Sequence, residues 1–172
     1  MSVKLYLSQE KINQRVTELA DQINRDYAGK ELMVIGVLNG AFMFTADLIR
    51  KIKVPVTLEF ISASSYGDGT ESSGRVNINM DIKRDMKGQH VLLVEDIVDT
   101  GLTLSSLMRV LETRNPASLK LCSFLYKPAR LKHPVNIDYL AFEIEDHFVI
   151  GYGLDYAGKF RELPYVGIYE GE

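Results

Sequence analysis

The sequence predicts an α/β fold in which an open, mostly parallel, twisted sheet is flanked by helices. Three observations carry this prediction: short apolar runs that suit strands buried on both faces, helix-periodic segments that alternate with those runs, and a composition typical of a globular domain. The chain has 172 residues, of which 46% are hydrophobic and 25% are charged. Because a chain of this length can bury a full core, we expect residues 1–172 to form one domain.

The chain begins with an amphipathic helix and continues with a first strand–helix unit. Apolar residues recur every three or four positions from Ser8 to Tyr27, and Ser8 is a suitable N-cap. The run Leu32–Val37 is almost entirely apolar, which predicts a buried strand, and Ala41–Arg50 predicts the helix after it. Such a strand, loop and helix are the start of a parallel α/β sheet.

A long polar loop lies between the next two predicted strands. Val56–Ser62 and Val76–Ile82 have the alternation of half-buried strands, and Ala63–Arg75 between them is rich in Ser and Gly. Loops of this length without structure of their own are uncommon inside a compact domain and usually act as lids or binding elements. The alternative is a disordered insertion.

Further strand and helix signals complete the alternation. His90–Val94 predicts a second buried strand, and the helix after it shows one apolar face and ends before Pro116. The apolar residues of that face are Leu104, Leu107, Met108 and Leu111. The remaining predicted strands are Ser118–Tyr126, Tyr139–Glu143, Phe148–Tyr152 and Leu163–Tyr169, the last as an edge or terminal strand.

Composition and charge exclude several classes of function. The net charge is −3, which lacks the basic footprint of a duplex-binding protein, so we expect no nucleic-acid partner. No apolar stretch approaches the length of a membrane span, and the first residues lack the apolar core of a signal peptide. The single Cys122 lies in an apolar run and is interpreted as a core residue. We therefore expect a cytoplasmic protein.

The segment Val91–Leu104 carries the chemistry. Its apolar strand leads into the carboxylates Glu95, Asp96 and Asp99, which are costly beside a sheet unless a cation or hydrogen-bond donors meet them. The following TGLT turn runs into a helix start, where backbone N–H groups and hydroxyls converge on an anion. A ligand with hydroxyls or a metal at one end and a phosphate at the other meets both demands, as a sugar phosphate does.

Other motifs are incomplete. Gly153–Phe160 matches the beginning of a phosphate-binding P-loop, but Phe160 replaces the required Ser or Thr. The three histidines are scattered and accompany no cysteine pair, which argues against a zinc site. The common serine-hydrolase pattern G-x-S-x-G does not occur.

At this point the sequence resembles the type I phosphoribosyltransferases, and among them the bacterial hypoxanthine-guanine phosphoribosyltransferases. VEDIVDTGLTL (Val94–Leu104) matches the phosphoribosyl-pyrophosphate motif, and SSYGDGTESSG (Ser64–Gly74) matches the catalytic loop. FLYKP (Phe124–Pro128) matches the purine-selecting segment, and Phe148–Gly167 matches the C-terminal base and pyrophosphate segment. The four matches occur in order and cover nearly the whole chain.

The resemblance implies binding roles at the sugar and pyrophosphate end of the site. Glu95 and Asp96 would bind the ribose 2′- and 3′-hydroxyls, directly or through Mg²⁺. Asp155 would hold a second Mg²⁺, and Arg161 would contact pyrophosphate. The residues implied to cradle the 5′-phosphate are Asp99, Thr100, Gly101, Leu102 and Thr103.

The resemblance also implies how the purine base is held. Lys127 would donate to the purine O6, Phe148 would stack on the ring, and the Val149 backbone would meet the opposite edge. Asp99 would be the general base near purine N7. The catalytic residues implied to close over the reaction are Ser65 and Tyr66.

Two positions depart from the pattern of some relatives. The turn Leu38–Asn39–Gly40 corresponds to the pyrophosphate-binding loop, and Asn39 stands where some relatives have Lys. Leu102 likewise stands where some relatives have Lys. We therefore expect the phosphates to be held by main-chain N–H groups, hydroxyls, Mg²⁺ and Arg161.

The resemblance finally implies a fold detail, a reaction and an assembly. The fold would add a small hood, built from the terminal segments, and a long mobile loop. The reaction would join phosphoribosyl pyrophosphate to hypoxanthine or guanine, in a homodimer or homotetramer for which Val76–Ile82 is a candidate interface. Alternatives are a preference for xanthine, or an RNA-binding regulator of the same fold. The regulator would want a basic face and could lose Asp99, whereas this chain is acidic and retains Asp99.

Overall fold

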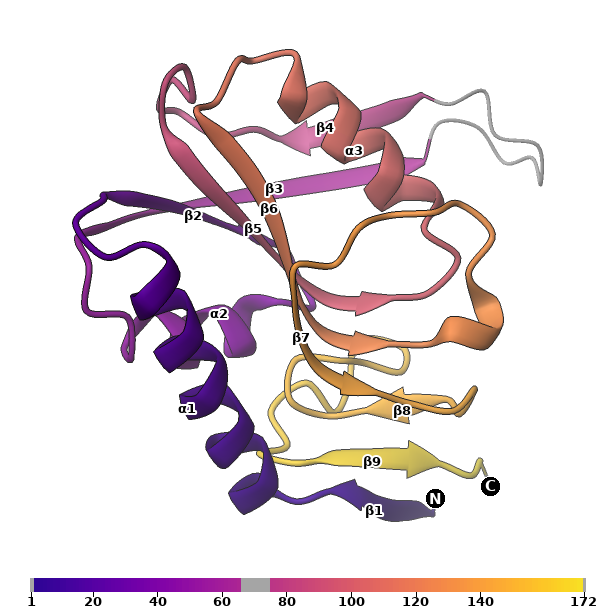
Figure 1. The fold of residues 1–172 in the computed structure, drawn as a ribbon. Coiled ribbons are helices and arrows are strands. Elements are labelled where there is room, and N and C mark those ends of the chain that lie inside the picture. The colour runs from indigo at the N-terminus through magenta and orange to yellow at the C-terminus, as the bar shows by residue number, and fades with distance from the viewer. Residues whose placement is uncertain (1, 66–74, 172) are drawn as a thin grey trace.

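A six-stranded and a three-stranded sheet form the framework of the protein (Figure 1). The computed structural model describes residues 2–65 and 75–171. In spatial order, the strands of the large sheet are β4 (Val76–Met80), β3 (Val56–Ser65), β2 (Leu32–Val37), β5 (His90–Val98), β6 (Ser118–Tyr126) and β7 (Tyr139–Glu143). All neighbouring pairs are parallel except β3 and β4. The predicted open, mostly parallel α/β sheet is confirmed.

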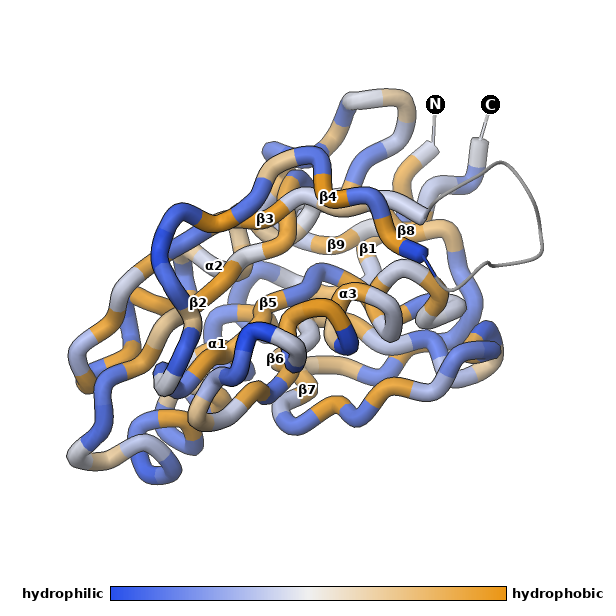
Figure 2. The backbone as a smooth tube through the Cα atoms, turned by 90° about the horizontal axis from the view of Figure 1, so that it is seen from above, coloured by the Kyte–Doolittle hydropathy of each residue, from blue (hydrophilic) through white to orange (hydrophobic). Residues whose placement is uncertain are grey.

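Helices cover both faces of the large sheet. Helices α1 (Gln9–Asp26) and α2 (Phe42–Ile49) pack on one face, and α3 (Leu102–Glu112) packs on the other (Figure 1). Consecutive strand residues point to opposite faces, so Val34 joins the first core cluster and Ile35 the second. Burial on both faces explains why β2 is apolar throughout, while several peripheral loops are hydrophilic (Figure 2).

Helix α1 forms for the reasons that its sequence indicates. The Ser8 hydroxyl accepts a hydrogen bond from the Lys11 N–H at 3.2 Å, which caps the helix. The chain leaves the helix through Gly29, whose φ of +78° is a left-handed conformation that glycine adopts without strain. The buried residues are the predicted apolar stripe: Ile12, Val16, Leu19, Ala20 and Ile23.

Pairing between strands moves three predicted boundaries in the large sheet. Strand β3 continues to Ser65, although a loop was expected from residue 63, because residues 63–65 pair with β4. Strand β4 ends at Met80 and not at Ile82. Strand β5 continues through Glu95 and Asp96 to Val98, because β6 pairs with it as far as Tyr126. The polar side chains hid this extension, since main-chain pairing does not require apolar residues.

The small sheet has the order β1–β9–β8, with antiparallel pairs. Its strands are β1 (Val3–Leu7), β8 (Val149–Ile150) and β9 (Val166–Tyr169). The sequence pattern did not predict β1. It predicted Leu163–Tyr169 as an edge or terminal strand; β9 begins at Val166, is the last strand of the chain and lies in the middle of this sheet. Val3 pairs with Tyr169, so the two ends of the chain lie side by side (Figure 1). This sheet agrees with the expected hood of terminal segments.

No helix within residues 2–65 and 75–171 is long and apolar enough to cross a membrane.

Tyr152 connects the C-terminal segment to α2. Its side chain is 3% exposed, its ring centroid lies 4.8 Å from that of Phe124, and its hydroxyl donates to Asp47 Oδ2 at 2.5 Å. Burial is the main cause that raises the pKa of the Tyr152 hydroxyl, so it stays a protonated donor.

Tyr152→Phe is expected to lower the free energy of unfolding by about 1.5–3 kcal/mol, because it removes a hydrogen bond to a charged group. The measurement is urea unfolding, with a lower midpoint and an unchanged slope. The Tyr165 hydroxyl makes no hydrogen bond within the described part of the chain, so Tyr165→Phe is the matched control. Equal midpoints for Tyr152→Phe and wild type would contradict the prediction.

Candidate functional site

Two cavities meet at the carboxyl ends of β5 and β6. The large cavity has a volume of about 450 Å³ and the small cavity about 160 Å³. The large cavity is lined by Asp96, Ile97, Asp99, Lys127, Arg130, Asp146, Phe148, Val149, Leu154 and Asp155. The small cavity is lined by Glu95 and by residues 97–104. Asp99 and Ile97 line both cavities, so a single ligand can extend from one into the other.

The small cavity is formed by the turn from β5 into α3. Gly101 precedes the helix with a φ of +83°, and a Cβ there would lie 2.1 Å from the His133 carbonyl oxygen. Only glycine fits this close approach. The Thr103 hydroxyl contacts the Ser65 hydroxyl of β3 at 2.5 Å. The start of α3 therefore presents main-chain N–H groups and hydroxyls to the cavity, which suits an anion.

Glu95 and Asp96 form a carboxylate pair at the end of β5. The Asp96 N–H donates to Glu95 Oε1 at 2.9 Å, and the Ile97 N–H donates to Asp96 Oδ1 at 2.7 Å. Burial, and next the charge of Asp96, raise the pKa of Glu95 well above its ordinary value. A hydroxyl donor or a cation at this place would offset the cost of the two charges.

Glu95→Gln is expected to raise the melting temperature of the ligand-free protein at about pH 8. A carboxyl whose pKa is raised by folding destabilises the protein above its unfolded pKa, and this destabilisation disappears as the pH falls below that value. The advantage of the variant should therefore shrink towards about pH 4. Differential scanning calorimetry at both pH values checks this, with Glu18→Gln on the surface of α1 as the control. A wild type that is the more stable protein at pH 8 would contradict it.

The turn after β2 packs against this carboxylate pair. A Cβ on Gly40 would lie 1.8 Å from Asp96 Oδ2, and a Cβ on Gly153 would lie 2.2 Å from the Gly40 carbonyl oxygen. The peptide bond between Leu38 and Asn39 is cis. The predicted turn Leu38–Asn39–Gly40 thus lies beside Asp96, although none of its three residues lines either cavity.

Lys127 and Phe148 supply a hydrogen-bond donor and an aromatic ring to the large cavity. Lys127 is only 7% exposed, and its Nζ lies 3.6 Å from Asp146 Oδ1, which is longer than a hydrogen bond. Its ammonium group can therefore donate to a ligand oxygen in the cavity. The Phe148 ring is 53% exposed and meets the Tyr156 ring edge-on at 5.8 Å. Together with buried Val149, these residues suit a flat ring that carries a hydrogen-bond acceptor.

Arg130 and Asp146 line the cavity but were not predicted from the sequence. Arg130 ends the 3₁₀ turn η1 (Pro128–Arg130), and its Nε lies 2.6 Å from Asp99 Oδ1. Its Nη1 lies 3.9 Å from Asp146 Oδ2. The proline directly after Lys127, which begins the turn that ends at Arg130, was the available signal, but isolated charges in loops are usually solvated.

The predicted residues of the C-terminal segment contact each other. Arg161 Nη2 lies 3.4 Å from Asp155 Oδ1, and Arg161 Nη1 donates to the Gly153 carbonyl oxygen at 2.7 Å. The Gly158 N–H donates to Asp155 Oδ2 at 2.8 Å. Asp155 lines the large cavity, whereas Arg161 lines neither cavity. Tyr66, the other predicted lid residue, lies outside the described residues.

The carboxylates of the site suit a magnesium ion held jointly with a ligand. No group of three or more His, Cys, Asp or Glu side chains that could hold a metal occurs in the described part of the chain. Mg²⁺ commonly binds through one or two carboxylates and completes its shell with substrate phosphates and water. Glu95, Asp96 and Asp155 provide such oxygen ligands, so the donor set fits a metal that arrives with a phosphorylated substrate.

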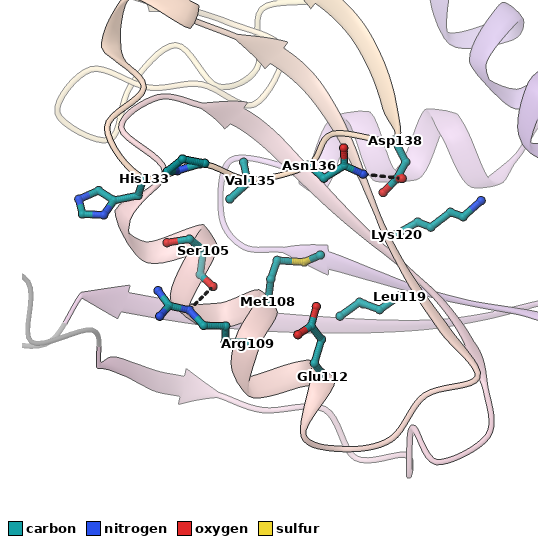
Figure 3. A pocket seen from close by; sticks show the side chains of 11 residues that line it. Ser105, Met108, Arg109, Glu112, Leu119, Lys120, His133, Val135, Asn136 and Asp138 are labelled. Carbon is teal, nitrogen blue, oxygen red and sulfur yellow. Dashed lines mark hydrogen bonds between the residues drawn. The ribbon is translucent and has the colours of Figure 1, made fainter.

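A further cavity of about 580 Å³ lies outside this site, between α3 and the segment 133–138 (Figure 3). Met108 and Leu119 supply apolar surface, and Arg109, Glu112 and Lys120 supply charges of both signs. None of the predicted site residues lines it.

Known proteins of similar sequence belong to one family. The family model for the phosphoribosyl transferase domain matches residues 2–157. The chain is 45% identical to a hypoxanthine phosphoribosyltransferase of Haemophilus influenzae, over 96% of this chain and 94% of that protein. It is 48% identical to a hypoxanthine-guanine phosphoribosyltransferase of Mycobacterium bovis, over 94% and 83% of the two chains.

A solved structure gives the same result. The crystal structure of a hypoxanthine-guanine phosphoribosyltransferase from Bacillus anthracis superposes with a TM-score of 0.93 at 46% identity, and the match covers 98% of this chain and 99% of that one. The two identities, the family match and the shared fold agree with the resemblance that the motifs indicated. The chain belongs to the phosphoribosyltransferase family.

Proposed function

We propose that this protein is a purine salvage enzyme that transfers the phosphoribosyl group of 5-phosphoribosyl 1-pyrophosphate to hypoxanthine or guanine. The products are IMP or GMP and pyrophosphate. The observation that carries the proposal is the junction of the two cavities at Asp99. One cavity suits a phosphate and the other suits a flat base, and the carboxylate lies where a sugar would join them.

The sugar phosphate binds at the end of β5. Main-chain N–H groups and hydroxyls of Thr100–Thr103 hold the 5′-phosphate, helped by the start of α3. Glu95 and Asp96 accept hydrogen bonds from the ribose 2′- and 3′-hydroxyls. This satisfies a carboxylate pair that is otherwise expensive to keep charged.

The base binds in the large cavity. Lys127 donates to the purine O6, Phe148 stacks on the ring, and the main chain at Val149 meets the opposite edge. Asp99 accepts the proton from purine N7 while the bond from N9 to ribose C1′ forms and the bond from C1′ to pyrophosphate breaks. General-base catalysis of this kind contributes about 10²–10⁴-fold to a rate.

The pyrophosphate leaves beside the turn Leu38–Asn39–Gly40. Asn39 supplies no positive charge, so Arg161 balances the negative charge that develops on the leaving group. Asp155 would hold Mg²⁺ at this end, and Glu95 and Asp96 would hold it near the ribose. When bound, Mg²⁺ neutralises charge on the pyrophosphate oxygens.

Ser65 and Tyr66 close over the substrates in this proposal. The contact between the hydroxyls of Ser65 and Thr103 supports this role for Ser65, because Thr103 belongs to the segment that is proposed to hold the 5′-phosphate. Closure would exclude water from the reacting C1′ centre. We further propose a cytoplasmic homodimer or homotetramer without a nucleic-acid partner, for which light scattering coupled to size-exclusion chromatography is the test.

The function is tested by steady-state turnover of four bases with Mg²⁺ and phosphoribosyl pyrophosphate. We expect hypoxanthine and guanine to be converted to their monophosphates, and adenine to be a negligible substrate. Preferential use of xanthine would show that the protein is a xanthine-preferring phosphoribosyltransferase in place of a hypoxanthine-guanine one. Failure to convert any of the four bases would refute the proposal.

A further inference from the structure

The segment 127–133 packs alongside the turn 98–101 and contacts successive residues of it. Lys127 N donates to the Val98 carbonyl oxygen at 3.0 Å, Arg130 Nε lies 2.6 Å from Asp99 Oδ1, and Lys132 N and His133 N each donate to the Thr100 carbonyl oxygen at 2.9 Å. The His133 carbonyl oxygen also lies close to Gly101, since a Cβ there would be 2.1 Å from it. Three consecutive residues of the turn are therefore held by one neighbouring segment, and the fourth packs against it.

One of these contacts differs in kind from the others. Val98 and Thr100 accept hydrogen bonds from main-chain N–H groups of the segment, whereas Asp99 accepts one from the Arg130 side chain. The other carboxylate oxygen, Asp99 Oδ2, has no hydrogen-bond partner among the residues that the structure describes. Arg130 thus occupies one oxygen of a carboxylate that lines both cavities of the site, and leaves the other oxygen free to accept a proton.

Arg130 also approaches a second carboxylate of the large cavity. Its Nη1 lies 3.9 Å from Asp146 Oδ2, and Asp146 Oδ1 lies 3.6 Å from Lys127 Nζ. Asp99, Arg130, Asp146 and Lys127 alternate in charge around the space where the base is proposed to bind. The short turn η1 keeps Arg130 near Lys127, with the Arg130 N–H donating to the Lys127 carbonyl oxygen at 3.1 Å.

We propose that Arg130 is a positioning residue that orients the Asp99 carboxylate for proton transfer from the purine. The inference rests on the proposed function, and it assigns Arg130 no contact with the substrate. A guanidinium fixes a carboxylate better than an ammonium does, because its planar N–H groups define a direction as well as a charge. With Oδ1 held, the carboxylate keeps a constant orientation at the cavity that it lines. A misplaced catalytic group can reduce a rate by about 100-fold.

The proposed role of Arg130 predicts a loss of activity without a comparable loss of stability, which a purely structural role would not. The side chains of Asp99 and Arg130 are 41% and 46% exposed, and exposed ion pairs contribute little to folding. Arg130→Met should therefore change the melting temperature by less than about 4 °C. We expect it to lower kcat by about 100-fold without changing the KM for phosphoribosyl pyrophosphate. Arg130→Lys should recover part of kcat, because it retains the charge but not the planar geometry.

The control is Arg84→Met. Arg84 is exposed, and its Nε lies 3.6 Å from Oε1 of the half-buried Glu59; neither residue lines a cavity of the site. We expect this variant to retain the wild-type kcat and melting temperature. A control that lost activity to the same extent as Arg130→Met would overturn the assignment, because the loss would follow from removing any surface arginine.

A double-mutant cycle decides whether Arg130 acts through Asp99. If it does, the loss from Arg130→Met should fall from about 100-fold in the wild type to a few-fold in the Asp99→Asn background. Equal losses in the two backgrounds would overturn the positioning role, while Asp99→Asn alone would still test the general base. An Asp99→Asn enzyme with unchanged kcat would refute the proposed mechanism instead. The two failures are therefore distinguishable.

Discussion

Lys127→Ala is expected to reduce the ability of the enzyme to distinguish 6-oxopurines from adenine. In the wild type, we expect adenine to be disfavoured by about 10⁴–10⁵-fold in kcat/KM, as in other sites that are built to bond one polar group. An ammonium only donates hydrogen bonds, so it suits the O6 acceptor of hypoxanthine and guanine and opposes the 6-amino donor of adenine. The Lys127 side chain is buried, and water would not replace its bond freely.

The comparison needs the kcat/KM of hypoxanthine, guanine and adenine for both enzymes. In the alanine variant, the values for hypoxanthine and guanine should fall together, and their advantage over adenine should shrink. Lys132→Ala is the matched control, because Lys132 is an exposed lysine of the same segment whose main-chain N–H contacts Thr100. Unchanged base preference after Lys127→Ala would assign selection to another group in the cavity. Xanthine also carries a 6-oxo group, so its rejection would depend on contacts near Val149.

Sequence patterns predict the buried part of the fold better than its margins. Strands β2, β6 and β7 have the predicted bounds, because each carries a continuous signal of the environment that buries it. Strand β1 was missed because its partner β9 is more than 150 positions away along the chain, and a pattern of five residues carries no information about that pairing. The same long-range pairing places β9 in the middle of the small sheet.

The candidate site was predictable to a similar degree. The carboxylates and the TGLT turn are adjacent in sequence, so their chemistry alone indicates a sugar phosphate. Lys127, Phe148 and Asp155 come from separate segments, and only the resemblance connected them to that turn; the fold brings all three to the large cavity. Neither the local residue pattern nor the resemblance predicted a role for Arg130, because that role depends on a side-chain contact with Asp99, 31 positions away in the sequence.

Asp99→Asn is expected to lower kcat by about 10²–10⁴-fold, because a carboxamide keeps the size of the side chain but cannot accept the purine proton as a base. Affinity for Mg²⁺-bound phosphoribosyl pyrophosphate should change by no more than a few-fold, since the 5′-phosphate is held in this proposal mainly by the N–H groups and hydroxyls that line the small cavity. Single-turnover kinetics measures the chemical step, and isothermal titration calorimetry measures the affinity separately.

Two outcomes are informative about the shared position of Asp99 between the cavities. Asp21→Asn, at an exposed site on α1, controls for the substitution itself and should leave both quantities unchanged. If Asp99→Asn weakens binding of phosphoribosyl pyrophosphate by as much as it lowers kcat, Asp99 acts chiefly in binding, and the general base lies elsewhere. If only the chemical step is slowed, the carboxylate at the junction serves the base cavity. Proton transfer then uses the carboxylate whose Oδ1 lies 2.6 Å from Arg130 Nε.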